Sequence, residues 1–314
     1  MQYHFAPLQG FTDAVFRETH AKHFKGIDAY YTPFCRVEKG EMRWHDQKEI
    51  SPERNPNLFE QGLLVPQIIG NSAEEVTILI KKIIEMGYQR IDLNFGCPFP
   101  MIAKKEKGAG ILSHPEKVKE VLEATQAFPD TTFSVKMRLG MHEPSEAEQL
   151  LPILNEARLS HITMHARLGK DQYKGELDLD AFSLFIKGSA HPVIYNGDIT
   201  RIEEINATME RFPSISAIMI GRGLLQNPCL VEEALSGTAY TTTKRISKIK
   251  DFLDDLENGY AEKLNGGEGQ LVQKLTSYWE YLLPGLDHKS RKKILKSKKL
   301  ADYKGAFMEG LRSL

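Results

Sequence analysis

Residues 88–98 read YQRIDLNFGCP, an apolar segment that runs directly into a Gly-Cys-Pro turn. A strand that ends in polar residues and a Gly-Pro break directs side chains beyond the sheet. Asn94 offers both a hydrogen-bond donor and an acceptor, which is enough to bind an amide or imide edge. Cys97 lies between a flexible Gly and a rigid Pro, but a single cysteine is more often a buried structural thiol. Cys97 is therefore a candidate catalytic residue only if other polar side chains gather around it.

Seven further short apolar segments occur along the chain, and most are followed by an amphipathic helical pattern. The eight segments are Tyr3–Leu8, Ala29–Phe34, Leu63–Ile69, Arg90–Gly96, Phe133–Leu139, His161–Ala166, Pro192–Gly197 and Ala217–Gly223. Alternation of strand and helix, repeated eight times, is typical of a (β/α)8 TIM barrel. An open, doubly wound parallel sheet is the alternative, but it would not need eight equivalent strands. The sequence therefore predicts an α/β fold with a (β/α)8 barrel.

Polar residues occur at the carboxyl ends of six of these segments. In a (β/α)8 barrel all strands end at the same rim, where active sites are found. The polar residues at the predicted strand ends are Gln67, Asn94, Cys97, Lys136, Arg138, His165, Arg167, Asn196, Asp198 and Arg222. A single Lys, Arg or His in such a position would be explained by solvation or by a local hydrogen bond. A set drawn from six strands predicts an active site at this rim.

The last two predicted strands point to a phosphate-binding site. The tripeptides NGD at 196–198 and GRG at 221–223 bring backbone N–H groups and a guanidinium to the place where barrels commonly bind phosphate. No G-x-G-x-x-G motif follows the first strand, so a dinucleotide bound on a Rossmann domain is not indicated. A mononucleotide cofactor fits these features better.

Composition and cysteine usage limit the class of protein. Of the residues, 41% are hydrophobic and 26% are charged, which is typical of a globular protein. No run of 18 apolar residues occurs, and the first residues lack a basic region followed by an apolar one, so we expect neither a membrane span nor a secretory signal. Cys35, Cys97 and Cys229 are widely spaced and form no CxxC pair, which argues against a disulfide framework and a zinc site. We expect a cytoplasmic protein that binds no metal.

Charge is distributed unevenly along the chain. From residue 241 onward there are 15 Lys and Arg against 10 Asp and Glu, whereas residues 1–240 have 26 against 32. Spacings of three and four predict one basic face of a helix between residues 289 and 304, formed by Lys289, Lys292, Lys296 and Lys299. An apolar stripe at the same spacing would dock this helix, formed by Leu300, Tyr303, Phe307 and Leu311. We expect a barrel in residues 1–240 and a small all-helical domain in residues 241–314.

At this point the motifs resemble a known family. The segment APLQGFTD at residues 6–13, followed by Phe16 and Arg17, is similar to the opening motif of the tRNA-dihydrouridine synthases. Other motifs follow in that family's order and spacing over roughly residues 3–235: Gln67, Asp92–Pro98, KMRLG at 136–140, HAR at 165–167, NGD at 196–198 and IGRG at 220–223. Residues 33–37, and the segment from there to Gln61, look most like bacterial subgroup C, which acts in the D-loop.

The resemblance implies an FMN enzyme that uses NADPH to reduce selected D-loop uridines of tRNA to 5,6-dihydrouridine. Hydride would pass from FMN N5 to C6 of the uracil, and Cys97 would donate a proton to C5. The implied cofactor-binding residues are Pro7, Leu8, Gln9, Gln67, Lys136, His165, Asn196, Gly197, Asp198, Gly221 and Arg222. The expected substrate contacts in the barrel are Arg36, Asn94, Arg138 and Arg167, and His165 would help Asn94 to orient the uracil.

A uridine in stacked tRNA cannot present C5 and C6 to a flavin inside a barrel, so it must be flipped out. Contacts elsewhere must offset the cost of flipping. The basic helical face is the expected source of these contacts, and it adds Lys292, Lys296 and Lys299 to the substrate-binding residues. No protein partner is indicated, and we expect a monomer.

Two other activities would use some of the same residues. A flavin-dependent reductase of a free pyrimidine or enone would need the rim but not the basic C-terminal region. A Schiff-base aldolase would use Lys136 as the nucleophile beside a phosphate-binding rim, and it would be colourless. A non-catalytic RNA-binding barrel would have no use for the rim residues.

Overall fold

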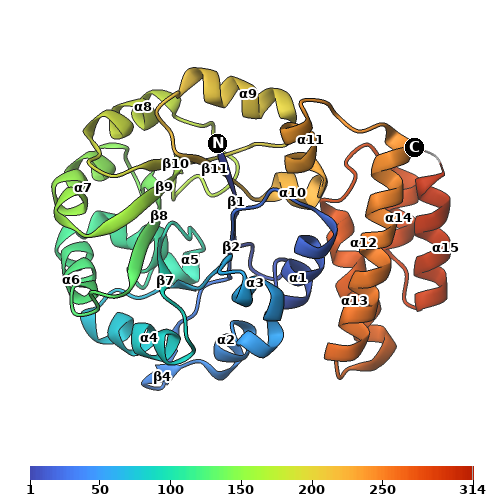
Figure 1. Cartoon of the computed structure of the whole chain (residues 1–314), viewed down its shortest axis with the longest axis horizontal. Coiled ribbons are helices and arrows are strands. Elements are labelled where there is room, and N and C mark those ends of the chain that lie inside the picture. Colours follow the sequence, from blue (N-terminus) through green and yellow to red (C-terminus); the bar gives the residue numbers. More distant parts are fainter. Residues whose placement is uncertain (313) are drawn as a thin grey trace.

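The computed structural model describes residues 1–312 and 314, and its centre is a parallel β-barrel (Figure 1). The barrel strands are β1 (Gln2–Phe5), β2 (Ala29–Tyr31), β5 (Leu64–Val65), β6 (Gln67–Ile68), β7 (Arg90–Phe95), β8 (Thr132–Gly140), β9 (Leu159–Leu168), β10 (Val193–Asn196) and β11 (Ala217–Ile220). Strand β5 pairs with β2, and strand β6 pairs with β7, on either side of Pro66. Because proline has no N–H, these two short segments form one interrupted barrel strand. Eight parallel strand positions result, and the predicted (β/α)8 barrel is confirmed.

Helices surround the barrel, as Figure 1 shows. They are α1 (Ala14–His23), α4 (Ala73–Glu85), α6 (Pro115–Thr125), α7 (Ser145–Glu156), α8 (Leu179–Gly188), α9 (Ile202–Arg211), α10 (Arg222–Gln226) and α11 (Leu230–Ser236). The connection from β2 to β5 is longer and contains a hairpin of β3 (Val37–Glu38) and β4 (Glu41–Met42), then α2 (Trp44–Glu49), η1 (Pro52–Arg54) and α3 (Pro56–Glu60). Two short helices, α5 (Pro100–Ala103) and η2 (Gly108–Ser113), follow β7. None of the described helices is long and apolar enough to cross a membrane.

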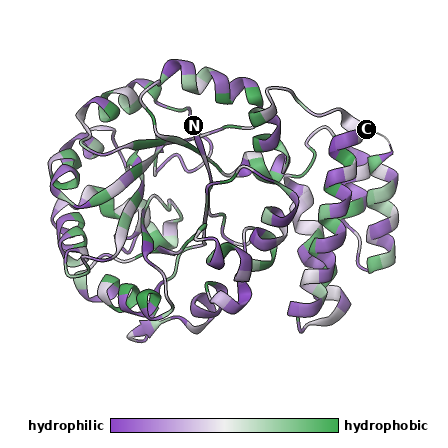
Figure 2. Cartoon of the chain, viewed as in Figure 1, coloured by the Kyte–Doolittle hydropathy of each residue, from purple (hydrophilic) through white to green (hydrophobic). Residues whose placement is uncertain are grey.

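Helix α4 illustrates why these segments are helical. Ser72 caps its N-terminus by accepting a hydrogen bond from the backbone N–H of Glu75. Val76, Leu79, Ile80 and Ile83 recur at spacings of three and four, and all four are buried against the barrel. Figure 2 shows hydrophobic and hydrophilic residues alternating along the helices of the ring, as expected when one face is buried.

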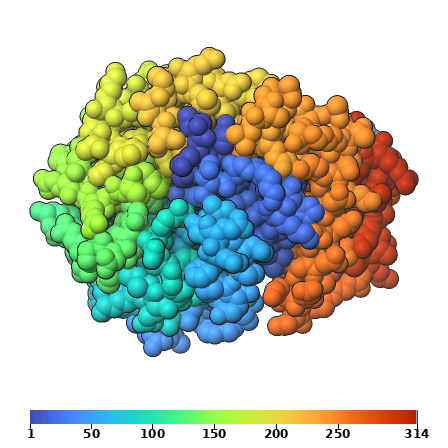
Figure 3. Space-filling model, in the orientation of Figure 1, coloured from blue at the N-terminus to red at the C-terminus, as the bar shows by residue number. Residues whose placement is uncertain are grey.

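A helical region follows the barrel and lies beside α1 (Figures 1 and 3). It contains α12 (Thr242–Lys263), α13 (Gly267–Ser277), η3 (Tyr278–Glu280), α14 (His288–Leu295) and α15 (Leu300–Leu311). The ring of Phe16 packs on Phe252 and Tyr278, with centroid distances of 5.5 and 5.0 Å. Tyr260 Oη donates to Asp13 Oδ1 over 2.7 Å, and Lys274 Nζ lies 2.8 Å from the other oxygen of that carboxylate. The helical region therefore shares apolar and polar contacts with the start of the barrel.

The prediction of one basic helix between residues 289 and 304 is wrong. Helix α14 ends at Leu295, Lys296 is its C-cap, and Lys299 has an extended backbone as the N-cap of α15. Like charges repel along the run from residue 291 to 299, and Ser297 is a weak helix former, so the helix breaks there. The predicted docking stripe lies on α15: Tyr303, Phe307 and Leu311 are buried, and Leu300 is partly buried against the core.

Candidate active site

A cavity of about 410 Å³ opens at the carboxyl ends of the barrel strands. All of the predicted cofactor residues line it: Pro7, Leu8, Gln9, Gln67, Lys136, His165, Asn196, Gly197, Asp198, Gly221 and Arg222. Cys97, Asn94 and Arg138 also lie on its wall. The volume is within the range of cofactor sites, and the lining combines apolar surface with a few converging polar groups.

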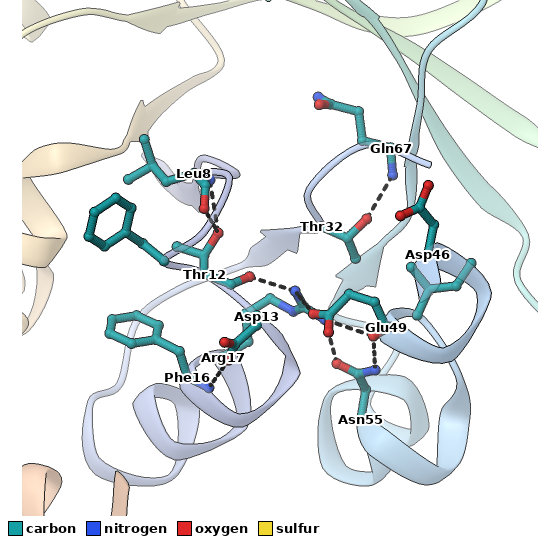
Figure 4. A network of polar contacts seen from close by, with 12 residues as sticks. Leu8, Thr12, Asp13, Phe16, Arg17, Thr32, Asp46, Glu49, Asn55 and Gln67 are labelled. Carbon is teal, nitrogen blue, oxygen red and sulfur yellow. Dashed lines mark hydrogen bonds and ion pairs between the residues drawn. The ribbon is translucent and has the colours of Figure 1, made fainter. Parts of the chain in front are cut away.

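The first loop of the barrel is held from below by a buried arginine (Figure 4). The Thr12 hydroxyl accepts a hydrogen bond from the backbone N–H of Leu8 over 2.8 Å, which closes the turn carrying Pro7 and Leu8 to the cavity. Arg17 is 1% exposed and donates to the carbonyl of Thr12 over 2.6 Å, to Glu49 over 3.0 Å and to Asn55 over 2.7 Å. The opening motif of the sequence is therefore a rigid support for one wall of the cavity.

A buried carboxylate lies behind the cavity wall, next to the lining residue Gln67. Asp92, on β7, accepts hydrogen bonds of 2.6 Å from the Ser134 hydroxyl and from Gln67 Nε2. Burial raises the pKa of Asp92 to about 6, and the two hydrogen bonds and nearby Lys136 oppose that rise. Asp92 is therefore ionised at neutral pH, although it is fully buried.

Asn94 connects Gln67 to the catalytic cysteine candidate. Its Nδ2 donates to Gln67 Oε1 over 2.6 Å, and its Oδ1 accepts from the backbone N–H groups of Gly96 and Cys97 over 3.1 and 2.9 Å. Sequence reasoning expected Asn94 to contact substrate. The structure also gives this side chain the task of shaping the turn on which Cys97 lies.

The turn is held on its other side as well. Arg138 Nε donates to the carbonyl of Gly96 over 3.0 Å, and the backbone N–H of Ala109 donates to the carbonyl of Cys97 over 2.9 Å. Gly108 has a φ of +59°, and a Cβ there would lie 2.6 Å from the carbonyl oxygen of Cys97, so only glycine fits. Burial raises the pKa of the Cys97 thiol. The thiol is therefore protonated at neutral pH and able to act as an acid.

Lys136 is one of the cations that line the cavity. Its Nζ donates to Asn196 Oδ1 over 2.9 Å, and Asn196 is oriented by donating its Nδ2 to the carbonyl of Met219 over 2.8 Å. Burial lowers the pKa of Lys136 to about 8, with a contribution from nearby Arg138. No carboxylate among the described residues lies within ion-pair distance of Lys136. A buried ammonium whose hydrogen-bond partner is a neutral amide favours an anionic or electron-rich group in the cavity.

An arginine pair holds the loop that follows β10. Asp198 accepts from Arg167 through both carboxylate oxygens, at 2.9 and 2.5 Å, and from Arg222 over 2.7 Å. These hydrogen bonds, that of Arg167 above all, lower the pKa of Asp198. Asp198 has a φ of +39°, which is uncommon for a residue other than glycine. The predicted phosphate loop therefore has a distinct backbone conformation fixed by two guanidinium groups.

Three arginines predicted to contact the substrate either donate to other groups of the protein or lie outside the cavity. Arg138 donates to the carbonyls of Leu168 and Gln172 as well as that of Gly96, and it is 1% exposed. Arg167 is 5% exposed and lies behind Asp198 rather than on the cavity wall. Arg36 is outside the cavity, at the base of the β3–β4 hairpin, where its N–H donates to Asp46.

The predicted basic residues of the helical region do not line the cavity. Lys292, Lys296 and Lys299 are exposed, and no ion pair is found for them among the described residues. They are therefore available for contact with an anion. The neighbouring Lys293 and Lys304 instead pair with Glu309 and Glu257.

His165 and Tyr173 complete the upper wall. Burial and the surrounding cations hold the pKa of His165 well below its usual range, so its imidazole is neutral. Tyr173, which sequence reasoning missed, lies between Arg138 and Arg222, with its ring 5.3 and 5.2 Å from their guanidinium carbons. It occurs in an aperiodic loop after β9, and two arginines at the ends of β8 and β11 were the only signal that an aromatic ring could stack there.

The donor set suits a flavin mononucleotide. Lys136, Arg138 and Arg222 on the wall exceed the carboxylate charge of Asp198, so the cavity favours an anion such as a phosphate. A Cβ on Gly223 would lie 2.0 Å from the carbonyl oxygen of Ile199, which shows how closely the two phosphate-loop candidates approach. Apolar surface from Pro7, Leu8 and Met219 is present on the same wall for a flat ring system.

Comparison with known proteins gives one family and several relatives. The model of the dihydrouridine synthase (Dus) family matches residues 4–280. A tRNA-dihydrouridine synthase B of Pasteurella multocida is 28% identical over 226 residues, which cover 72% of this chain and 66% of that protein. A tRNA-dihydrouridine synthase B of Vibrio cholerae is 27% identical over 252 residues, covering 79% and 76%. The match thus spans about two thirds of the Pasteurella protein and more of the Vibrio one.

Solved structures with a similar fold have low sequence identity. Morphinone reductase superposes with a TM-score of 0.56 at 12% identity, covering 76% of this chain and 87% of that one. The old yellow enzyme from Trypanosoma cruzi gives a TM-score of 0.54 at 10% identity, covering 76% and 89%. At such identities these likenesses show the barrel fold alone.

Proposed function

Because the chain belongs to the dihydrouridine synthase family, we propose that it is a flavin-dependent oxidoreductase that reduces uridines of tRNA to 5,6-dihydrouridine. NADPH is the proposed reductant and FMN the proposed cofactor. The observation that carries this proposal is the convergence of Cys97, Lys136, Asn94 and Arg222 on one cavity. Asn94 and Cys97 come from the end of β7 and its turn, Lys136 from β8 and Arg222 from the end of β11, as expected for a barrel active site.

FMN, when bound, supplies the hydride for C6 of the uracil. The remaining tasks fall to the chain. Lys136 would hold negative charge on the pyrimidine side of the flavin, and Gln67 would bond its edge. Pro7, Leu8 and Gln9 would contact the ring system, and the loops at residues 196–198 and 221–222 would bind the ribityl phosphate. The ammonium of Lys136, which donates to the neutral amide of Asn196 and forms no ion pair among the described residues, supports this orientation.

Cys97 is the proposed proton donor to C5. Its thiol lies on the cavity wall and is protonated at neutral pH, because burial raises its pKa. Asn94 and neutral His165 would orient the uracil. Asn94 keeps one Nδ2 hydrogen free, and His165 can donate from Nδ1, because its Nε2 faces the donor Arg167 Nη1 at 3.5 Å. Arg138 and Arg167 would act mainly through Gly96 and Asp198, to which they already donate.

The target uridine must be flipped out of the tRNA, so binding surface is needed outside the cavity. We assign this task to a tRNA-binding helical domain in residues 241–314, through Lys292, Lys296 and Lys299, with Arg36 as a contact from the barrel, residues 1–240. We propose a cytoplasmic monomer. The D-loop is the proposed target: residues 33–37 favour subgroup C, whereas the relatives above carry the letter B, and mapping the modified position decides between the two.

The direct test uses purified full-length protein. It should bind FMN rather than FAD, and it should convert uridine to dihydrouridine in unmodified tRNA when NADPH is added, as detected by mass spectrometry of tRNA digests. Free uridine should not be reduced at a comparable rate. Absence of a bound flavin after reconstitution, or absence of tRNA reduction with flavin bound, would contradict the proposal.

Two alternative activities would use the same cavity. A reductase of free enones or pyrimidines would use the same cavity, and such an enzyme would reduce free substrate as readily as tRNA. The pKa of about 8 for Lys136 suits a Schiff-base aldolase, because part of the amine is then neutral and nucleophilic. Borohydride trapping of a carbonyl substrate on Lys136 in a colourless protein would favour the aldolase.

A further inference from the structure

Four buried polar side chains form a continuous chain behind the Cys97 turn. Ser134 donates to Asp92, Gln67 donates to Asp92, and Asn94 donates to Gln67, each over 2.6 Å. The register of the strands produces this chain, because Gln67 and Ser134 are the partners of Asp92 on β6 and β8. Asn94, two residues beyond Asp92 on β7, points to the same side of the sheet.

This chain has a fixed direction. An ionised carboxylate can only accept hydrogen bonds. Gln67 must therefore turn its Nε2 toward Asp92, and its Oε1 is then left facing Asn94. Asn94 must turn its Nδ2 toward that oxygen, so its Oδ1 faces the two backbone N–H groups of Gly96 and Cys97. The backbone N–H groups at one end and the carboxylate of Asp92 at the other therefore require the same orientation of both amides, and Asp92 does not itself reach the cavity wall.

We propose that Asp92 is a positioning residue, whose ionised carboxylate sets the direction of the Gln67–Asn94 amide chain and thereby holds Cys97 in place for proton transfer. This inference rests on the proposed function of Cys97. The carboxylate is ionised at neutral pH, since its raised pKa is only about 6. Lys136 and Tyr31 are the titratable neighbours that interact with it electrostatically.

Reversing the chain would release the turn. If residue 92 could donate, Gln67 could rotate its amide by half a turn, and Asn94 would follow. Asn94 would then present its NH2 group to the N–H groups of Gly96 and Cys97, which leaves two donors facing donors. The other described anchors of the turn, Arg138 and Ala109, bind its carbonyl oxygens and cannot replace this contact.

The experiment compares full-length parental protein with Asp92→Asn, Gln67→Glu and the double variant Asp92→Asn/Gln67→Glu, all in saturating FMN. Asp92→Asn keeps the shape but allows both chain directions. The double variant moves the carboxylate to position 67, where it accepts from both neighbours and again forces Asn94 to direct its Oδ1 toward the turn. Gln67→Glu alone places a second carboxylate next to that of Asp92, where Gln67 Nε2 now donates to Asp92 over 2.6 Å, so the two carboxylates repel each other.

The readout is alkylation of Cys97 by iodoacetamide, followed by mass spectrometry of its peptide. Cys35 and Cys229 are 0% exposed and serve as internal unreactive thiols. A full pH–rate profile separates the thiol pKa from the pH-independent rate constant, which reports how freely the turn moves. Loss of one hydrogen bond should increase that rate constant by about fivefold in Asp92→Asn. In the double variant it should return to within about twofold of the parental value.

A purely structural role for Asp92 would not be restored by moving its charge to the neighbouring side chain. The inference is overturned if Cys97 is alkylated at the parental rate in Asp92→Asn. It is also overturned if the pH-independent rate constant of alkylation in the double variant is not lower than that of each single variant. Should Asp92→Asn not fold, Gln67→Glu against the double variant gives the same decision. Alkylation does not require any activity toward tRNA, so failure of the proposed function would appear separately, as a parental protein that leaves tRNA unreduced.

Discussion

Replacing Cys97 with Ala removes the thiol that the structure places on the cavity wall, while Cys35 and Cys229 are buried elsewhere. Burial raises the pKa of the Cys97 thiol, so at pH 7.5 nearly all of it is the acid form. A positioned general acid contributes about 10²–10⁴ to the rate of the step that it serves. The tRNA-dependent step of Cys97→Ala should therefore slow by at least about 100-fold, equivalent to roughly 2.7 kcal/mol.

The assay separates the two half-reactions by stopped-flow absorbance. The enzyme is first reduced with NADPH without oxygen, and then mixed with tRNA that lacks dihydrouridine. Reduction by NADPH needs no acid at Cys97 and should stay within about twofold of the parental rate. The tRNA step of the parental enzyme should be independent of pH near neutrality and should fall as pH rises through the thiol pKa, and this fall should be absent in Cys97→Ala.

Cys229→Ala is the matched control, because it removes a thiol that does not line the cavity. Both of its half-reactions should remain at the parental rates if the protein folds. If Cys97→Ala reduced tRNA as fast as the parental enzyme, Cys97 would be a structural thiol and the proton would come from another group.

Three further changes test other parts of the account. Lys136→Met should lower the midpoint potential of the bound flavin in a potentiometric titration, because the ammonium would no longer stabilise the anionic reduced flavin; unit charges 4 Å apart at an effective dielectric of about 20 attract by about 4 kcal/mol. An unchanged potential would place Lys136 away from the flavin. Arg17→Met leaves Glu49 buried without its cation and should reduce the free energy of unfolding in urea by about 3–5 kcal/mol, and a change below about 1 kcal/mol would show that the pair contributes little. Reversal of Lys292, Lys296 and Lys299 to Glu should weaken tRNA binding and flatten its salt dependence by up to about one log–log unit per lost contact, with flavin content unchanged; an intact affinity and salt slope would place the tRNA elsewhere.

The barrel could be predicted because its strands are short apolar runs that end in polar residues, as in the segment from Arg90 to Gly96. The interruption at Pro66 was missed because the surrounding apolar residues were interpreted as one continuous strand, although a proline within the segment lacks the N–H needed for pairing; the structure shows the result in the pairing of β5 with β2 and of β6 with β7. The end of α14 was missed for a related reason. Lysines at spacings of three and four continue past Leu295, and spacing alone does not show where mutual repulsion stops a helix.

The residues of the site could be predicted from the sequence, but the hydrogen bonds between them could not. The types and positions of Lys136, Cys97 and Asn196 place them at the rim, since strand ends converge in a barrel. The sequence does not reveal that Arg138 and Arg167 direct their N–H groups to carbonyls and to Asp198, because those partners lie about 30 or more residues away in the chain. The role of Asp92 was hidden for the same reason, as its partners come from two neighbouring strands.

The central claim is that this protein reduces uridines in tRNA, and mapping of dihydrouridine in cells tests it most directly. Total tRNA from cells that lack the protein is compared, position by position, with tRNA from cells that carry it again as the parental form or as Cys97→Ala. We predict that dihydrouridine disappears from one or a few D-loop positions, returns with the parental protein and stays absent with the variant. An unchanged dihydrouridine pattern in the deletion cells, with no other protein able to modify those positions, would contradict the account.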